Sequence, residues 1–206
     1  MNRRIWLYLS IFSVFLIWGC GTKVMVPPEI DLKEYGSVGI VDFSSDAEGN
    51  LGEFMTQEFL AEISLFQKGV GIVELGSMDE VLKSVRQDRL NPEAIKAIGQ
   101  KHNLNSIITG NLSVSDIKPN IDIAAIVSYI SVEAEAEASL TVKLLETQNG
   151  ATIWTDSAQG KENVADVSVL SANNIHFDAR DPEEAYGDLA KHLVEEVTED
   201  LRISWK

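Results

Sequence analysis

The chain has 206 residues, and its 32 Asp and Glu outnumber its 17 Lys and Arg, which gives a net charge of −15. This length suits one ordinary domain, and a composition of 45% hydrophobic and 24% charged residues excludes disordered and collagen-like proteins. The negative charge argues against nucleic acid as a partner, because phosphate contacts need clustered Lys and Arg. A single Cys excludes an intramolecular disulfide framework and a CxxC metal site.

The N-terminus has the pattern of a signal peptide. Arg3 and Arg4 form a short basic region before an apolar run over residues 5–18. A run of about 14 residues is too short to span a bilayer as a helix, but it suits the apolar region of a secretory signal. The run leads to Gly19 and Cys20, the only Cys of the chain.

The residues around Cys20 resemble the lipobox of bacterial lipoproteins, in which an aliphatic residue stands three positions before the Cys and a small residue directly before it. Ile17 and Gly19 fit this pattern, whereas Trp18 is bulkier than usual at its position. The resemblance implies cleavage before Cys20 and a thioether-linked diacylglycerol on its thiol. Residues 1–19 are therefore predicted to be a lipoprotein signal peptide. A secretory signal with an unrelated Cys, or an uncleaved anchor, is the alternative interpretation.

The predicted cleavage has consequences for charge and location. The mature chain would have 187 residues and a net charge of −17, because Arg3 and Arg4 are removed. Two or three acyl chains such as palmitate hold a protein durably at a membrane, whereas one alone binds marginally. By resemblance to the sorting rule of enteric bacteria, Gly21 in place of Asp favours the outer membrane over the inner one.

The mature chain is predicted to consist of a tether and one domain. Residues 20–34 comprise the lipidated Cys and a stretch with Pro27 and Pro28 but no helical or strand period, which indicates a semi-extended tether. Such a stretch reaches at most about 50 Å when extended. Residues 35–206 form the predicted periplasmic domain.

The first half of the domain alternates strand and helix signals. Ser77 and Asn91 are typical N-cap residues, and Pro92 suits the first turn of a helix. The predicted elements are a strand at 38–43, a helix at 51–67, a strand at 70–74, helices at 77–89 and 91–103, and a strand that begins at Ser106.

The second half changes to the period of a half-exposed strand. Apolar and polar residues alternate over residues 132–143, which predicts a long strand with one apolar and one solvated face. Asn149 and Gly150 predict a hairpin turn, and residues 151–157 are the expected partner strand. Residues 160–180 are polar and weakly patterned, so they are predicted to be a loop with some local structure.

A last helix is predicted from Asp181 to about Ile203. Asp181 and Pro182 form a typical helix start, and Leu189, Leu193 and other apolar residues follow at steps of four. The fold class is therefore α/β, or mixed α+β, with a C-terminal helix.

Four stretches of the domain resemble motifs of the curli-secretion lipoprotein family (CsgG) and its relatives. These relatives include the Pel polysaccharide lipoprotein (PelC), the lipoprotein activators of penicillin-binding proteins (LpoB) and the N-terminal domain of TolB. The stretches are Val38–Phe43, Val70–Glu74 with Met78–Leu82, Ile95–Gly99 with Ile107–Gly110, and Leu144–Trp154. Leu75 and Leu104–Asn105 depart from the family pattern. The resemblance implies a three-layer CsgG/TolB-N-like domain in which helices flank a mixed β-sheet. It transfers a scaffold without a catalytic site, so Gly110 and Trp154 are expected to serve packing.

No catalytic or cofactor motif is present in the sequence. His102, His176 and His192 are isolated, and there is no HExxH, GxSxG, P-loop or GxGxxG pattern. The protein is therefore predicted to be no enzyme, with no cofactor and no metal.

Three acidic residues lie on one side of the predicted long strand. Glu133, Glu135 and Glu137 alternate with alanines, so they share a face of the sheet. They are a candidate acidic face for binding cations, although an exposed sheet face explains them more simply.

Three classes of function stay open at this point. By resemblance, the leading one is a lipid-anchored, non-enzymatic factor in outer-membrane assembly or export, forming a homo-oligomeric ring around an exported polymer or beside an envelope protein. The alternative is a lipoprotein activator of a cell-envelope enzyme such as a penicillin-binding protein. The third is a hydrolase whose site the sequence does not reveal. A curli-type barrel subunit is disfavoured, because residues 116–131 are too few for two membrane-crossing strands and a turn.

Overall fold

The computed structural model describes residues 23–47, 50–115, 118–120, 133–164, 169–171, 174–175 and 182–205. Contacts between residues divide the chain into two units, one of residues 1–27 with 203–206 and one of residues 28–202. Cys20 and the predicted signal peptide lie outside the described residues. No helix within the described ranges is long and apolar enough to cross a membrane.

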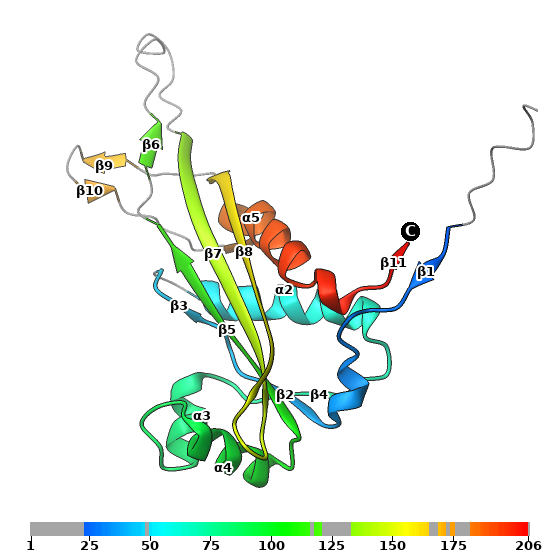
Figure 1. Ribbon diagram of the computed structural model, residues 1–206. Helices are drawn as coiled ribbons and strands as arrows, with labels where there is room; N and C mark the ends of the chain where they lie inside the picture. The colour runs from blue at the N-terminus through cyan, green and yellow to red at the C-terminus, as the bar shows by residue number, and fades with distance from the viewer. Residues whose placement is uncertain are drawn as a thin grey trace, which may run out of the picture. The chain divides into compact units, whose positions relative to one another are not determined.

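A seven-stranded mixed sheet forms the centre of the larger unit (Figure 1). Strands β2, β4 and β5 run parallel, whereas β7 is antiparallel to β5, β6 and β8. The short strands β3 and β6 extend the pairing beside β5 and β7. The bounds are β2 (Val38–Ile40), β3 (Ser44–Ser45), β4 (Ile72–Glu74), β5 (Ser106–Val114), β6 (Lys118–Asn120), β7 (Glu133–Glu146) and β8 (Thr152–Val164).

Helices cover both faces of this sheet, which confirms the predicted three-layer α/β class (Figure 1). Helices α2 (Leu51–Phe66) and α5 (Pro182–Val197) pack on one face, and α3 (Met78–Ser84) and α4 (Pro92–His102) on the other. Two 3-10 helices, η1 (Leu32–Tyr35) and η3 (Glu199–Leu201), complete the larger unit. The first core includes Phe59, Leu140 and Leu193, and the second includes Ile98 and Ile107, all fully buried.

The helix starts are those that the sequence predicts. The Ser77 hydroxyl accepts a hydrogen bond from the Glu80 N–H, and Asn91 Oδ1 accepts one from the Ala94 N–H at 2.8 Å. The end of the second predicted helix differs, because α3 stops at Ser84 instead of 89. Arg86 adopts a φ of 59°, which the helix cannot continue through.

The loop predicted at residues 160–180 is wrong in part. Strand β8 continues to Val164, and β9 (Val169–Ser171) pairs with β10 (Asn174–Ile175). The core side of β8 carries small residues here, because α5 lies close to the strand. A Cβ on Gly160 would lie 2.9 Å from a methyl carbon of Leu189. Without bulky apolar residues on its inner face, the second half of β8 shows no strand pattern in the sequence.

Gly110 and Trp154 serve packing, as predicted. A Cβ on Gly110 would lie 2.4 Å from the Phe43 ring, so only glycine permits this approach. The Trp154 ring is 8% exposed in the first core, and its Nε1 donates to Asp200 Oδ2 at 3.1 Å.

Part of the stretch predicted as a tether is folded. Leu32 is 1% exposed, and the buried side chain of Gln67 bonds the backbone around it. Gln67 Oε1 accepts from the Leu32 N–H at 2.9 Å, and its Nε2 donates to the carbonyls of Ile30 and Leu201 at 2.9 and 2.7 Å. Residues 30–34 therefore belong to the larger unit, and they shorten the part of the tether that is free to extend.

The smaller unit contains one short antiparallel ribbon. Strand β1 (Met25–Val26) pairs with β11 (Ser204–Trp205), with Met25 opposite Trp205 and Val26 opposite Ser204.

Candidate functional site

The second face of the sheet is only partly covered, because α3 and α4 pack at one end of it (Figure 1). Beyond these helices the alternation of β5, β7 and β8 places polar side chains on this face, of which Thr109 is buried and the others are partly or fully exposed. The strand register aligns them in rows, which are Thr109–Lys143–Thr155, Asn111–Thr141–Ser157 and Ser113–Ser139–Gln159. The hydroxyls of Thr141 and Ser157 lie 2.9 Å apart, so they are hydrogen-bonded across the strands. We call these nine residues the polar face.

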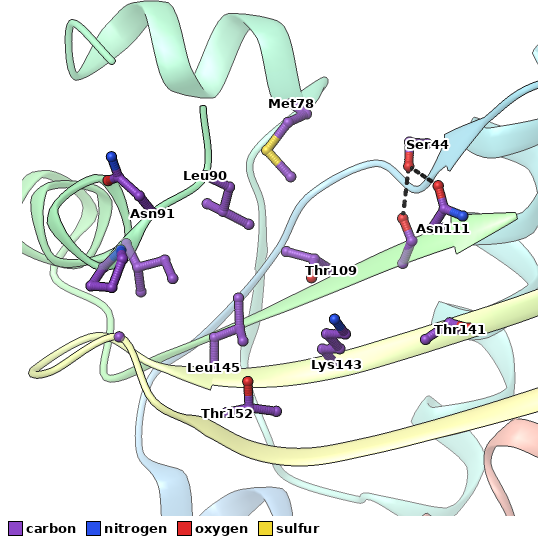
Figure 2. A pocket seen from close by; sticks show the side chains of 14 residues that line it. Ser44, Met78, Leu90, Asn91, Thr109, Asn111, Thr141, Lys143, Leu145 and Thr152 are labelled. Carbon is purple, nitrogen blue, oxygen red and sulfur yellow. Dashed lines mark hydrogen bonds between the residues drawn. The ribbon is translucent and has the colours of Figure 1, made fainter. Parts of the chain in front are cut away.

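A pocket of about 610 Å³ lies where the polar face meets α3 and α4 (Figure 2). Met78 from α3, Leu90 before α4 and Ile95 on α4 form its apolar wall. Its floor comes from the sheet, where Thr109 and Lys143 lie beside the pocket (Figure 2).

The lining of the pocket combines one positive charge with apolar and uncharged polar side chains. Among the described residues that line it, Lys143 alone is charged, and none is His, Cys, Asp or Glu. The Ser44 hydroxyl donates a hydrogen bond to Asn111 Oδ1 at 2.9 Å. The pocket can take a group with an apolar surface for the helices and a hydrogen-bond acceptor for Lys143.

Glu137 is the predicted site residue whose side chain the structure describes, and it does not line the pocket. Cys20 is outside the described residues. All three glutamates belong to β7, and the Glu137 side chain is exposed. The register places Lys118 opposite Glu135 and Lys161 opposite Glu137. The stripe of glutamates therefore runs beside lysines on its neighbouring strands.

No candidate metal centre is present in the described part of the chain, where no three His, Cys, Asp or Glu side chains gather closely enough to hold an ion. The sequence did not predict the pocket or the polar face, although the alternation of Ser139, Thr141 and Lys143 indicated a solvated face. The alternation within β7 alone does not show which strands and helices lie beside it.

Burial and acidic neighbours both act on Asp42, which lies two residues after the end of β2. Burial raises the pKa of this carboxyl above its ordinary value of 3.8, and the negative charges of Glu53, Glu74 and Glu80 raise it further. The folded state therefore binds this proton more tightly than the unfolded state does. Stability from this group is present below pH 3.8 and is lost as the pH rises through the folded-state pKa.

We expect Asp42→Asn to raise the melting temperature at pH 8 by about 1–3 °C, because it removes a partly buried charge from acidic neighbours. The gain should shrink toward pH 4, and thermal unfolding across this pH range measures it. Asp46→Asn is the matched control of opposite sign, since hydrogen bonds from the Ser113 hydroxyl and the Val114 N–H lower the pKa of Asp46. An Asp42→Asn protein that is less stable at pH 8 would contradict this electrostatic origin.

No family model matches the sequence, and no curated protein is significantly similar to it. Among solved structures, the PelC dodecamer from Paraburkholderia phytofirmans is 14% identical, with a TM-score of 0.47, and the match covers 89% of this chain and 98% of that one. A lipoprotein from Neisseria meningitidis is 14% identical, with a TM-score of 0.39 over 61% and 82% of the two chains. The LpoB C-terminal domain from Salmonella enterica is 13% identical, with a TM-score of 0.37 over 74% and 93%.

PelC and LpoB are two of the lipoproteins whose motifs this sequence resembles.

Proposed function

We propose that the protein is a lipid-anchored periplasmic lipoprotein that acts without catalysis in outer-membrane assembly or export. The observation that carries this proposal is the lipobox-like sequence that ends at Cys20, the only Cys of the chain. A diacylglycerol thioether on this residue would hold the 187-residue mature chain at the periplasmic face of the membrane. Gly21 after the Cys supports the outer membrane as its location.

The pocket supports a binding role over a catalytic one. Lys143 offers a positive charge beside an apolar wall, and among the described lining residues none is His, Cys, Asp or Glu. Such a site holds a partner or a polymer segment by shape and hydrogen bonds.

The edges of the sheet support assembly into a homo-oligomer. Strand β4, with three residues, lies at one edge of the sheet. Strand β8, with 13 residues, lies at the other edge, and among the described strands it pairs only with β7. A long edge strand can accept a strand from another chain. If β8 contacts a different surface on the next copy, the interface between copies is head-to-tail. Repeating that interface by the same rotation generates a closed ring of copies.

The alternative is an activator of a cell-envelope enzyme such as a penicillin-binding protein. The pocket favours this function, because a monomer could receive a side chain of such an enzyme there. The folded residues 30–34 argue against a long reach, since only residues 21–29 separate Cys20 from them. Within that stretch, Met25 and Val26 are also paired with β11. Nine residues span at most about 32 Å.

The acidic face gives a second test of the export function. We expect the triple change of Glu133, Glu135 and Glu137 to Gln to weaken binding of a decalysine peptide about five-fold at low salt, and to reduce its salt dependence. Titration at two salt concentrations measures both. Glu34→Gln, Asp88→Asn and Glu93→Gln together remove three exposed charges elsewhere as a control. If both triple changes weaken peptide binding equally, only the net charge of the protein matters. If the change of Glu133, Glu135 and Glu137 leaves binding unchanged, the acidic face does not bind the peptide.

The direct test of the anchor is the intact mass of the protein extracted from membranes. We expect the mass of residues 20–206 plus a diacylglyceryl group and an N-terminal acyl chain or a free amine. A mass that includes residues 1–19, or an unmodified Cys20, would refute the lipid anchor.

A further inference from the structure

Exposed apolar side chains concentrate in the smaller unit. Val24 is 61% exposed, Met25 55%, Ile203 38% and Trp205 63%. Within the described ranges, only Leu65 and Val73 are comparable exposed large hydrophobics outside this unit. The pairing of β1 with β11 places Met25 opposite Trp205 on one short ribbon, and Val24 and Ile203 directly precede the two strands.

The ribbon lies close in sequence to the predicted point of lipid attachment. Met25 follows Cys20 by five residues, which span at most about 18 Å. An acylated Cys20 would therefore keep Met25, and Trp205 paired with it, within that distance of the lipid glycerol. Exposed clusters of large apolar side chains normally mark a surface that another phase or molecule covers.

We propose that the ribbon of β1 and β11 is a membrane-docking surface that lies in the headgroup region of the bilayer to which Cys20 is anchored. This inference rests on the proposed lipid anchor. It adds a second, non-covalent contact between the chain and the membrane.

The side chains suit the bilayer interface better than its hydrocarbon interior. Trp205 combines a large apolar ring with an indole N–H donor, and this combination is typical of residues at the headgroup level. Lys23 is exposed beside the ribbon and can approach lipid phosphates. Each strand has only two residues, so the backbone keeps unpaired polar groups that need the hydrated interface.

The mature chain provides its own reporter, because it retains only Trp154 and Trp205 of the four tryptophans. Trp154 is 8% exposed and packed in the core, whereas Trp205 is 63% exposed. Lipid chains brominated near the headgroup quench a tryptophan that lies at that depth. The difference between the wild-type protein and Trp205→Phe therefore isolates Trp205 without altering the core.

The experiment uses the full-length mature lipoprotein in vesicles of phosphatidylethanolamine and phosphatidylglycerol, with and without bromine on the acyl chains. We expect bromine to lower the wild-type emission by about one-third or more, and the Trp205→Phe emission by about one-tenth or less. A double change of Val24 and Met25 to Ser should reduce quenching of Trp205, because the apolar area that holds the ribbon in the interface is smaller.

The outcomes separate this inference from the anchor. Protein that lacks the diacylglyceryl mass and does not join the vesicles would refute the anchor, and the inference would fall with it. Protein that carries the lipid and joins the vesicles, but shows equal quenching in wild type and Trp205→Phe, would overturn the docking surface alone. A third outcome would also overturn the docking surface. If Trp205 emission shifts to the blue as the protein concentration rises and is not quenched by brominated lipid, a second copy of the chain covers the ribbon.

Discussion

Cys20→Ser is expected to release the protein from the membrane fraction. Serine has no thiol for the thioether, so the variant loses the diacylglycerol that holds the mature chain. We expect the amount that stays with membranes after a high-salt wash to fall at least about tenfold. Fractionation and metabolic labelling with a palmitate analogue measure the two effects together.

Trp18→Ala is the matched control for this change. It alters the one residue that departs from the lipobox pattern and leaves Cys20 and Gly19 in place. We expect this variant to keep its label and its membrane location. Label that persists on Cys20→Ser would show that another residue is acylated, and unlabelled wild-type protein on membranes would indicate an uncleaved N-terminal anchor.

Gln67→Met should destabilise the larger unit more than other polar changes of similar size. The Gln67 side chain is 5% exposed and joins three segments through the backbone of Ile30, Leu32 and Leu201. Methionine fills a similar volume but leaves three backbone groups without partners. Each buried group costs about 1–3 kcal/mol, so we expect a loss of about 3 kcal/mol or more and a melting temperature lower by about 10 °C.

Gln57→Met, on the helix α2 that ends directly before Gln67, is the control. The Gln57 side chain is exposed and bonds only Glu74 Oε2, at 3.0 Å, so its loss should cost about 0.5 kcal/mol or less. Denaturant unfolding of both variants gives the comparison. Similar losses in the two proteins would show that Gln67 does not hold the three segments together.

The sequence predicted the helices and the parallel strands where local signals are strong. Asn91 and Pro92 identified the start of α4, and the apolar side chains at steps of four placed Leu189 and Leu193 in the core. Strand β8 was too short in the prediction because the residues under α5 are small, including Ala158 and Gly160. A pattern of bulky apolar side chains cannot appear where the helix leaves no room for them.

The candidate site depended on contacts that local patterns do not encode. Lys143 was recognisable as an outward residue of a strand, but its pocket forms only when α3 and α4 pack on the same face. The partnership of Gln67 with Ile30 and Leu201 spans 37 and 134 positions in the chain, so no spacing rule could find it. The lysines beside Glu135 and Glu137 likewise follow from strand register alone.

The molar mass of the full-length lipidated protein in mild detergent distinguishes the export factor from the enzyme activator most directly. Light scattering with negative-stain imaging gives both the mass and the shape, and lipidated protein is needed because a weak ring could dissolve without its anchor. We expect a closed ring of several copies joined at the long edge of β8. A monomer at every protein concentration would contradict the ring-forming export factor and would favour the activator of a cell-envelope enzyme.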